Sequence, residues 1–364
     1  MSFRVPFNDL HLAEESDAVR EAIARVVDRA WFVLGPEVEA FEREFATASG
    51  APHAVGVGNG TDAIALVLRA LGIGPGDEVI TTPLSAAYTA IAIVMAGARP
   101  VFADIDPERL TLDPRAAELA ITDRTAALLP VHLYGQPADT AAFAALAERK
   151  GLALVEDCCQ AHLATSVGRA VGTFGAAGAF SFYPTKNLGA LGDGGAVITR
   201  DPSLAARISR LRNGGQTDRY RHIEIGINSR LDEMQAAILR ARLPHLRRRT
   251  EERRTRAALY RSLLAGASVQ VPPEMDPGHV YHLFPIRTQR RGVLQERLSA
   301  SGVETLVHYP TPIFQQPAFA SLEGADCPQA VRASNEVLSL PLHPGLSPDA
   351  VTTVAEAVRK ESSS

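Results

Sequence analysis

Two kinds of apolar pattern alternate along the first half of the chain. Short apolar runs bounded by turn residues are typical of strands in a mostly parallel sheet covered on both faces. Such runs lie at 53–57, 79–82, 100–105, 126–131, 152–155, 177–182 and 195–199. Apolar positions at three- and four-residue spacing predict helices at 12–30, 36–49, 61–71, 85–96 and 139–150, and Asp113-Pro114 starts another. The pattern therefore predicts an α/β fold.

From about residue 202 the pattern becomes helical. Ser229 with Asp232 resembles a capping box before a helix to about Arg242, and Pro244 opens a long Arg-rich helix to about Leu264. A strand at 279–287 and helices at 291–301 and 349–360 follow. We therefore predict a large α/β domain over 1–245, with a helical arm at 1–35. A small α+β domain over 246–364 completes the chain, and we expect its tail, 361–364, to be disordered.

Composition excludes several classes of protein. The net charge of −4 argues against a broad nucleic-acid surface. The longest apolar run, Ala90 to Ala98, is far too short to span a bilayer, and the N-terminus lacks the apolar core of a signal peptide. The cysteines are Cys158, Cys159 and Cys327, too few for a disulfide framework and without zinc spacing. We therefore expect a cytoplasmic protein without a metal or a membrane partner.

Lysine is unusually scarce in this chain. Of 37 Lys plus Arg residues, only Lys150, Lys186 and Lys360 are lysines. A surface charge can be either residue, whereas only a primary amine condenses with an aldehyde to form a Schiff base. Lys150 and Lys360 lie in predicted helices and suit a solvated surface. Lys186 lies in a Gly-rich loop, so its amine is a candidate for covalent chemistry.

Acidic residues follow the apolar strand at 152–155, which is one strand before the loop that carries Lys186. Glu156 and Asp157 stand where the strand ends, and ligands of open α/β sheets bind outside the carboxyl ends of strands. Consecutive acids are also common in caps and turns, and the adjacent Cys158 and Cys159 suit a buried structural role. Since Lys186 follows the next strand, we expect Asp157 and Lys186 to lie on neighbouring strand ends.

A third candidate lies between the first strand and its helix. The sequence Gly58-Asn59-Gly60-Thr61-Asp62 places glycines before a helix N-terminus, where backbone N–H groups can bind phosphate. Thr61 occupies the place of the third glycine of a dinucleotide fingerprint, so a dinucleotide site is disfavoured. An ordinary turn capped by Thr61 or Asp62 is the alternative. The segments around Asn228 and around His308-Tyr309 are, taken alone, also compatible with a helix start and with packed structure.

Together these segments resemble the DegT/StrS-type nucleotide-sugar aminotransferases. The resemblance covers nearly the whole chain, from Val5-Pro6-Phe7 to Leu340-Pro341-Leu342. Each motif is modest alone, and their joint order is highly specific. The motifs are Glu156 to His162, Ser181 to Asn187, Gly192 to Gly195 and Asn228 to Ala237.

The resemblance implies a fold-type-I transferase that depends on pyridoxal 5′-phosphate (PLP) and forms a homodimer with shared active sites. It implies that Lys186 carries the cofactor and shuttles the proton, that Asp157 pairs with the pyridine nitrogen, and that Gln160 lies near the phenolic oxygen. The remaining implied contacts fall into two sets. The phosphate is held by Gly60, Thr61, Asp62 and Ser181, with Asn228 from the partner subunit. The sugar is met by Tyr183, Arg230, His308 and Tyr309.

The chain departs from the family where an aromatic side chain usually stacks on the cofactor. Ala86 occupies that place, and we expect Tyr88 to supply the ring instead. The segments at 132–139, 228–230 and 308–310 look more like members that aminate 3-keto sugars than members that aminate 4-keto sugars. The expected function is therefore transfer of an amino group from glutamate to C3 of a dTDP- or UDP-linked keto-hexose, and Arg230 would pair with a sugar carboxylate if one is present.

Three alternatives stay open. A C4 aminotransferase of the same family is the nearest. A sugar dehydratase of this scaffold would carry His in place of Lys186 or would need a cysteine cluster for iron and sulfur. A non-catalytic regulator with the same fold would have no need for an intact Lys186 and Asp157.

Overall fold

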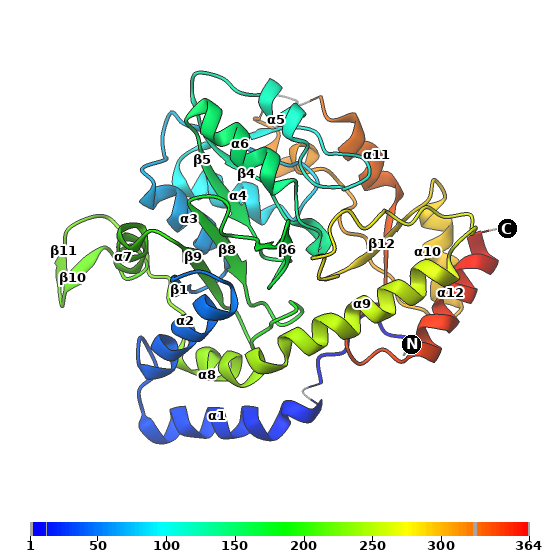
Figure 1. Cartoon of the computed structure of the whole chain (residues 1–364), viewed down its shortest axis with the longest axis horizontal. Helices are drawn as coiled ribbons and strands as arrows, with labels where there is room; N and C mark the ends of the chain where they lie inside the picture. Colours follow the sequence, from blue (N-terminus) through cyan, green and yellow to red (C-terminus); the bar gives the residue numbers. More distant parts are fainter. Residues whose placement is uncertain (1–2, 12, 323–325, 363–364) are drawn as a thin grey trace.

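The computed structural model describes residues 3–11, 13–322 and 326–362 (Figure 1). Its centre is a seven-stranded sheet with the strand order β1-β9-β8-β5-β4-β2-β3. The strands are β1 (His53–Val57), β2 (Glu78–Thr81), β3 (Arg99–Phe102), β4 (Thr125–Leu129), β5 (Ala153–Asp157), β8 (Ala177–Ser181) and β9 (Gly195–Thr199). Four pairings are parallel, and β9 runs antiparallel to both β8 and β1. The predicted mostly parallel sheet is thus confirmed.

Consecutive strand residues bury their side chains on opposite faces, as the period of two requires. Val155 belongs to the apolar cluster that includes α3 (Gly60–Ala70), α4 (Tyr88–Ala96) and α7 (Pro202–Leu211), whereas its neighbour Leu154 belongs to the cluster that includes α5 (Pro114–Leu119) and α6 (Thr140–Lys150). Over β8 and β9 this second face is covered by α2 (Pro36–Ala48) and α8 (Glu233–Arg242). The sheet is therefore buried on both faces, and its strand ends are left as the place for a site.

The C-terminal part packs around its own apolar core. The long α9 (Leu246–Leu263) contributes Tyr260, which stacks on Phe284 of the two-stranded sheet β12–β13. The elements of this part are β12 (Phe284–Arg287), β13 (Val337–Leu340), α10 (Arg291–Ala300), α11 (Pro328–Glu336) and α12 (Pro348–Ser362). Val5 joins the same core, so the chain's start lies against its end. The proposed division at residue 245 stays a prediction.

Several boundaries differ from the sequence prediction. The helix predicted over 85–96 begins only at Tyr88. The strand predicted over 279–287 covers only β12, because the backbone before it bonds to loops: the Val280 N–H donates to the Gly135 carbonyl. The predicted disordered tail is wrong for its first two residues, because α12 continues to Ser362. Residues 363–364, like Leu12 at the start of the first predicted helix, lie outside the described residues.

The first helix of the chain, α1 (Ser16–Arg29), lies along the outer side of α8 (Figure 1). The sequence prediction contained neither α11 nor β13. It also lacked the hairpins β6 (Thr165–Ser166) with β7 (Arg169–Ala170) and β10 (Gln216–Asp218) with β11 (Arg221–His222), and the 3-10 turns η2 (Leu133–Gly135), η3 (Leu243–His245), η4 (Ile313–Gln315) and η5 (Pro317–Phe319), while η1 (Ala13–Glu15) precedes α1. The β10–β11 hairpin projects from the body of the molecule. Within the described residues, no helix combines the length and apolar character needed to cross a membrane.

Candidate active site

The ends of β5 and β8 bring the two central predicted residues to one edge of the sheet. The two strands pair in parallel, and Asp157, the last residue of β5, lies opposite Ala179. β8 ends at Ser181, and the turn after it closes when the Lys186 N–H donates to the Tyr183 carbonyl at 2.8 Å. The predicted placement of Asp157 and Lys186 on neighbouring strand ends is confirmed.

The carboxylate of Asp157 is buried and fixed in orientation. Its Oδ2 accepts the Thr89 hydroxyl at 2.7 Å, and its Oδ1 accepts the Cys159 N–H at 3.0 Å. Thr89 belongs to the first turn of α4, so the group is held from two elements. An ionised carboxylate offers about four acceptor positions. Asp157 therefore keeps acceptor capacity for a ligand.

The amine of Lys186 has an unusual environment. Burial lowers the pKa of Lys186, while Cys159 and Asp157 act in the opposite direction. A lowered pKa makes the neutral amine more abundant near pH 7, and the neutral amine is the nucleophile and the base. The other two lysines lie on surface helices, where each is close to a glutamate. Lys186 is thus the lysine suited to chemistry.

The N-terminus of α3 lies against the end of β8. A Cβ atom on Gly60 would lie 2.7 Å from Cys159 Sγ and 2.8 Å from Ser181 Cβ, so glycine is required for this approach. Thr61 follows in the same first turn and is partly exposed. A helix N-terminus carries partial positive charge and free N–H groups. With the Ser181 hydroxyl, this turn forms a cradle for an anion.

The side chain of Asp62 is turned toward a distant segment of the chain. Its Oδ2 accepts the Ser229 hydroxyl at 2.6 Å and the Asn59 Nδ2 at 3.1 Å. Its N–H donates to Asn59 Oδ1 at 2.9 Å, so Asn59 caps α3. Asp62 therefore has both its N–H and its carboxylate engaged within the chain. Its part in binding phosphate stays a prediction.

Gln160 joins two tyrosines beside the site. Its Oε1 accepts the Tyr134 N–H at 2.7 Å, and its Nε2 donates to the Tyr309 hydroxyl at 3.1 Å. Tyr134 in turn donates its hydroxyl to the His308 carbonyl. Burial raises the pKa of Tyr309 to about 12 and lowers the pKa of His308 to about 4. Both side chains are therefore neutral near pH 7 and available as hydrogen-bonding groups.

The other predicted site residues face outward in the single chain. Tyr88, Tyr183 and Asn228 are exposed. Arg230 is half-buried, and its guanidinium donates to Asn213 Oδ1 at 3.4 Å. Tyr88 is nevertheless close enough to Tyr309 to contribute to the raised pKa of that tyrosine.

Sequence reasoning missed three residues that support the site. Thr89 holds Asp157, and Tyr134 connects Gln160 to His308. His162 is fully buried and donates from Nε2 to the Ser181 carbonyl at 2.9 Å. Burial lowers the pKa of His162 to about 3, which keeps the ring neutral. Each lies within or beside a segment singled out from sequence, but only the fold shows its contact.

One group of possible metal ligands occurs within the described part of the chain, formed by His132, Glu156 and Cys158. Both Glu156 oxygens already accept backbone N–H groups. Burial raises the pKa of the Cys158 thiol well above its usual value, which disfavours the thiolate that binds metals. This group is suited to packing rather than to metal binding.

Comparisons with known proteins agree with this geometry. The profile of the DegT/DnrJ/EryC1/StrS aminotransferase family matches residues 13–359. The chain belongs to this family. It is 50% identical to the dTDP-3-amino-3,4,6-trideoxy-alpha-D-glucose transaminase of Streptomyces venezuelae, over 98% of this chain and 96% of the relative. It is 44% identical to the UDP-N-acetyl-3-dehydro-alpha-D-glucosamine 3-aminotransferase of Acidithiobacillus ferrooxidans, over 98% and 97%.

Solved structures extend the likeness to three dimensions. DesV of S. venezuelae, solved with a ketimine intermediate, superposes with a TM-score of 0.96 at 48% identity over 100% of both chains. NtdA of Bacillus subtilis, solved with bound pyridoxamine phosphate (PMP), gives 0.93 at 30% identity over 100% of this chain and 86% of the other. The predicted fold-type-I transferase architecture is confirmed, and the enzyme depends on PLP as its family does.

The residues present fit PLP. Its aldehyde requires a primary amine, which Lys186 supplies. Its ring nitrogen suits a buried carboxylate with spare acceptor capacity, which is Asp157. Its phosphate suits the cradle of Gly60 and Ser181. These groups come from the end of β5, the end of β8 with the turn after it, and the N-terminus of α3, which packs against Ser181, so one ligand could touch all of them.

Proposed function

We propose that this enzyme transfers an amino group from glutamate to C3 of a dTDP- or UDP-linked keto-hexose in the biosynthesis of an amino sugar. The observation that carries the proposal is the placement of Lys186 and Asp157 at neighbouring strand ends in a chain this similar to transaminases named for 3-amino and 3-dehydro sugars. Amination at C4 is the alternative within the family.

In this proposal Lys186 and Asp157 are the catalytic residues. Bound PLP supplies an electron sink for negative charge at the amino carbon. Asp157 holds a proton on the ring nitrogen, where Thr89 and the Cys159 N–H keep its carboxylate in place. The Lys186 amine, whose pKa burial lowers, takes and returns the proton at the substrate carbon. Gln160 orients the cofactor beside its phenolic oxygen.

The remaining residues bind the two ends of the ligand. We assign the phosphate to Gly60, Thr61, Asp62 and Ser181, with Asn228 from the partner subunit, and the stacking ring to Tyr88. The sugar is assigned to Tyr183, Arg230, His308 and Tyr309. Support comes from the hydrogen bonds that join Gln160, Tyr309, Tyr134 and His308, which give this side of the site neutral polar groups suited to sugar hydroxyls.

We further propose a cytoplasmic homodimer with shared sites. The α4 helix, which carries Tyr88, also exposes Ile91, Val94 and Met95. An apolar face of this kind beside a site favours a protein interface. The link between α1 and α2 likewise exposes Trp31, Phe32 and Val33. A cytoplasmic location is supported by Cys158, Cys159 and Cys327, which are free thiols.

The decisive experiment is a panel of 3-keto and 4-keto nucleotide sugars, each carrying dTDP or UDP, incubated with glutamate and analysed by mass and NMR. We expect a product that carries its new amino group at C3. We also expect a yellow protein in which borohydride reduction links the cofactor covalently to Lys186. Lys186→Ala should abolish turnover, and Lys150→Ala, a surface lysine, should leave it unchanged. Turnover of 4-keto sugars alone would reject C3, and a colourless protein that PLP cannot reconstitute would reject the enzyme.

A further inference from the structure

The segment 227–233, called the strap here, leads into α8 and alternates between anchored and outward residues. Ser229, Leu231 and Glu233 are buried, whereas Asn228 and Asp232 are exposed. Successive side chains of an extended chain point to opposite sides. The residues that anchor the strap and the residues that it presents are therefore separate sets.

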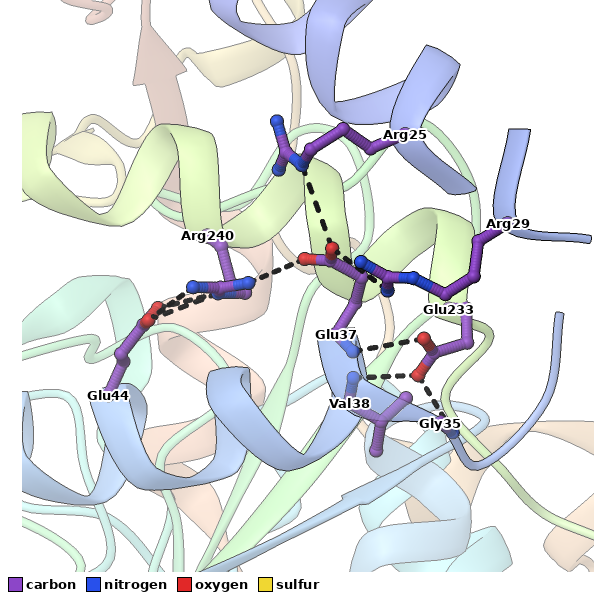
Figure 2. A network of polar contacts seen from close by, with 8 residues as sticks. All are labelled: Arg25, Arg29, Gly35, Glu37, Val38, Glu44, Glu233 and Arg240. Carbon is purple, nitrogen blue, oxygen red and sulfur yellow. Dashed lines mark hydrogen bonds and ion pairs between the residues drawn. The ribbon is translucent and has the colours of Figure 1, made fainter. Parts of the chain in front are cut away.

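The end of the strap is fixed by Glu233 (Figure 2). Its carboxylate accepts the N–H groups of Gly35 at 2.9 Å, Glu37 at 2.9 Å and Val38 at 2.8 Å, at the N-terminus of α2. Arg240 bonds Glu37 at 2.6 Å and so ties α8 to the same helix. Charge-assisted bonds to a helix N-terminus are strong. This end of the strap is rigid.

The middle of the strap is fixed by Ser229 to the phosphate cradle of its own chain. The Ser229 hydroxyl donates to Asp62 Oδ2 at 2.6 Å and accepts the Gly58 N–H at 2.9 Å. Its N–H donates to the Arg212 carbonyl at 2.9 Å. A Cβ atom on Gly58 would lie 3.1 Å from Ser229 Oγ, so the strap lies directly on the start of α3. Asp62 is held in turn by the cap residue Asn59.

This arrangement decides which active site Asn228 can serve. Because Ser229 points at α3 of its own chain, its neighbours Asn228 and Arg230 project from the other side of the strap. Asn228 is exposed, and its backbone pairs with Asn213 at the edge of the molecule. A residue held in this way is directed away from its own cradle and is available to a second copy of the chain.

We propose that Ser229 is a positioning residue that acts across the dimer: its bond to Asp62 sets the strap so that Asn228 and Arg230 enter the partner's site. The inference rests on the proposed function. It adds a physical link between the two sites, because Asp62 stands in the first turn of α3, which begins one subunit's cradle, and its carboxylate anchors the residues offered to the other. Ser229→Ala removes a bond to a charged group and should weaken PLP binding in the partner's site roughly tenfold.

Heterodimers with one competent site test this. In the first, a chain carrying both Lys186→Ala and Ser229→Ala pairs with the wild type, so the one Lys186 faces an altered strap. In the second, a Lys186→Ala chain pairs with a Ser229→Ala chain, so the one Lys186 faces an intact strap. The PLP concentration that gives half-maximal borohydride fixation to Lys186 is measured by mass spectrometry. We expect a tenfold rise in the first pair and little change in the second, relative to Lys186→Ala paired with the wild type.

The control replaces Ser229→Ala by Ser49→Ala, which removes a buried hydroxyl that has no hydrogen-bond partner and lies outside the strap. In the first pair, this control should leave the half-maximal PLP concentration equal to that of Lys186→Ala paired with the wild type. Equal weakening in both pairs, or weakening in the second alone, would overturn the inference. Wild type that is monomeric or that binds no PLP would instead overturn the proposed function. If Ser229→Ala chains form no heterodimer, Ser229→Cys, which keeps the volume and only a weak donor, takes its place.

Discussion

Glu156 and Asp157 are consecutive acids at the end of β5, and their surroundings are opposite. Glu156 is fully buried, and each of its oxygens is saturated. Oε1 accepts the N–H groups of Phe174 at 2.8 Å and Gly175 at 3.1 Å. Oε2 accepts the Gly172 N–H at 2.8 Å and lies 3.1 Å from His132 Nε2. Since His132 Nδ1 accepts the Ala138 N–H, Nε2 carries the proton and donates to Glu156.

Asp157, on the other face of the same strand, has two donors instead of four. The saturated carboxylate has no acceptor capacity left for a ligand, whereas the under-saturated one has, and this difference supports the proposed role of Asp157. The position of the two acids after an apolar run does not by itself show this difference in their hydrogen bonds. Their alternation along the strand gives one to the 172–175 loop and the other to the site.

The largest effect should come from Asp157→Asn. The amide keeps the shape of the side chain but removes the charge that keeps the ring nitrogen protonated. We expect PLP to bind and turnover to fall by roughly 10²–10⁴-fold, as measured by single-turnover kinetics on fully loaded protein. The matched control is Asp276→Asn. Asp276 is a buried aspartate outside the site that pairs with Arg109 and accepts the Ser166 hydroxyl, so the change should lower stability and leave the turnover of the folded enzyme intact. Wild-type turnover of Asp157→Asn would refute the catalytic role.

Glu156→Gln should have the opposite result, a loss of stability with little loss of turnover. Whichever way the amide turns, its NH₂ faces two N–H donors and leaves them unsatisfied, so we expect the free energy of unfolding to fall by about 3 kcal/mol. Turnover per folded, PLP-loaded site should stay within a few-fold. Urea unfolding and active-site titration measure the two quantities. Glu118→Gln, at a surface pair with Arg149, should change neither. Lost turnover at full stability would place Glu156 in the chemistry.

The sheet was predictable because its strands are apolar runs bounded by turns. β1 and β9 match the predicted runs residue for residue. Predictions failed where a contact between distant segments decides the structure. Ser229 was expected to cap α8, but its hydroxyl bonds Asp62 instead, and Glu233 caps α2 rather than its own helix. A local pattern identifies a capping residue but cannot show which helix it caps.

The site residues likewise divide into those that the sequence pattern indicates and those that it does not. Lys186 stood out from composition, and Asp157 from its place after a strand. Thr89 gave no such signal, because a threonine in the first turn of a helix is ordinary until the fold sets it beside Asp157. Asn228 and Arg230 came from family resemblance, and because their proposed contacts lie in a second chain, a single chain does not test them.

The smallest effect should come from Thr89→Val, which keeps the shape of Thr89 and deletes the hydroxyl that fixes Asp157. A hydrogen bond to a charged group contributes about 1.5 kcal/mol at the low end. If that bond serves mainly to orient the carboxylate, turnover should fall about tenfold, since 1.4 kcal/mol is a factor of ten. The Michaelis constant for the sugar should change little, because Thr89 contacts Asp157 rather than the substrate pocket. Steady-state kinetics of both substrates measure these changes.

Two further variants decide whether this loss belongs to orientation or to packing. Thr89→Ser keeps the hydroxyl and loses a methyl group, so it should restore most of the turnover. Thr81→Val makes the same isosteric change at a buried threonine whose hydroxyl donates to the Leu129 carbonyl, and it should cost stability without a tenfold loss of turnover. If Thr89→Val and Thr81→Val lose turnover equally, the hydroxyl of Thr89 has no special bearing on Asp157. The Thr89 bond to Asp157 would then be a stabilising contact like the four on Glu156, and the contrast between the two carboxylates would rest on the number of their donors alone.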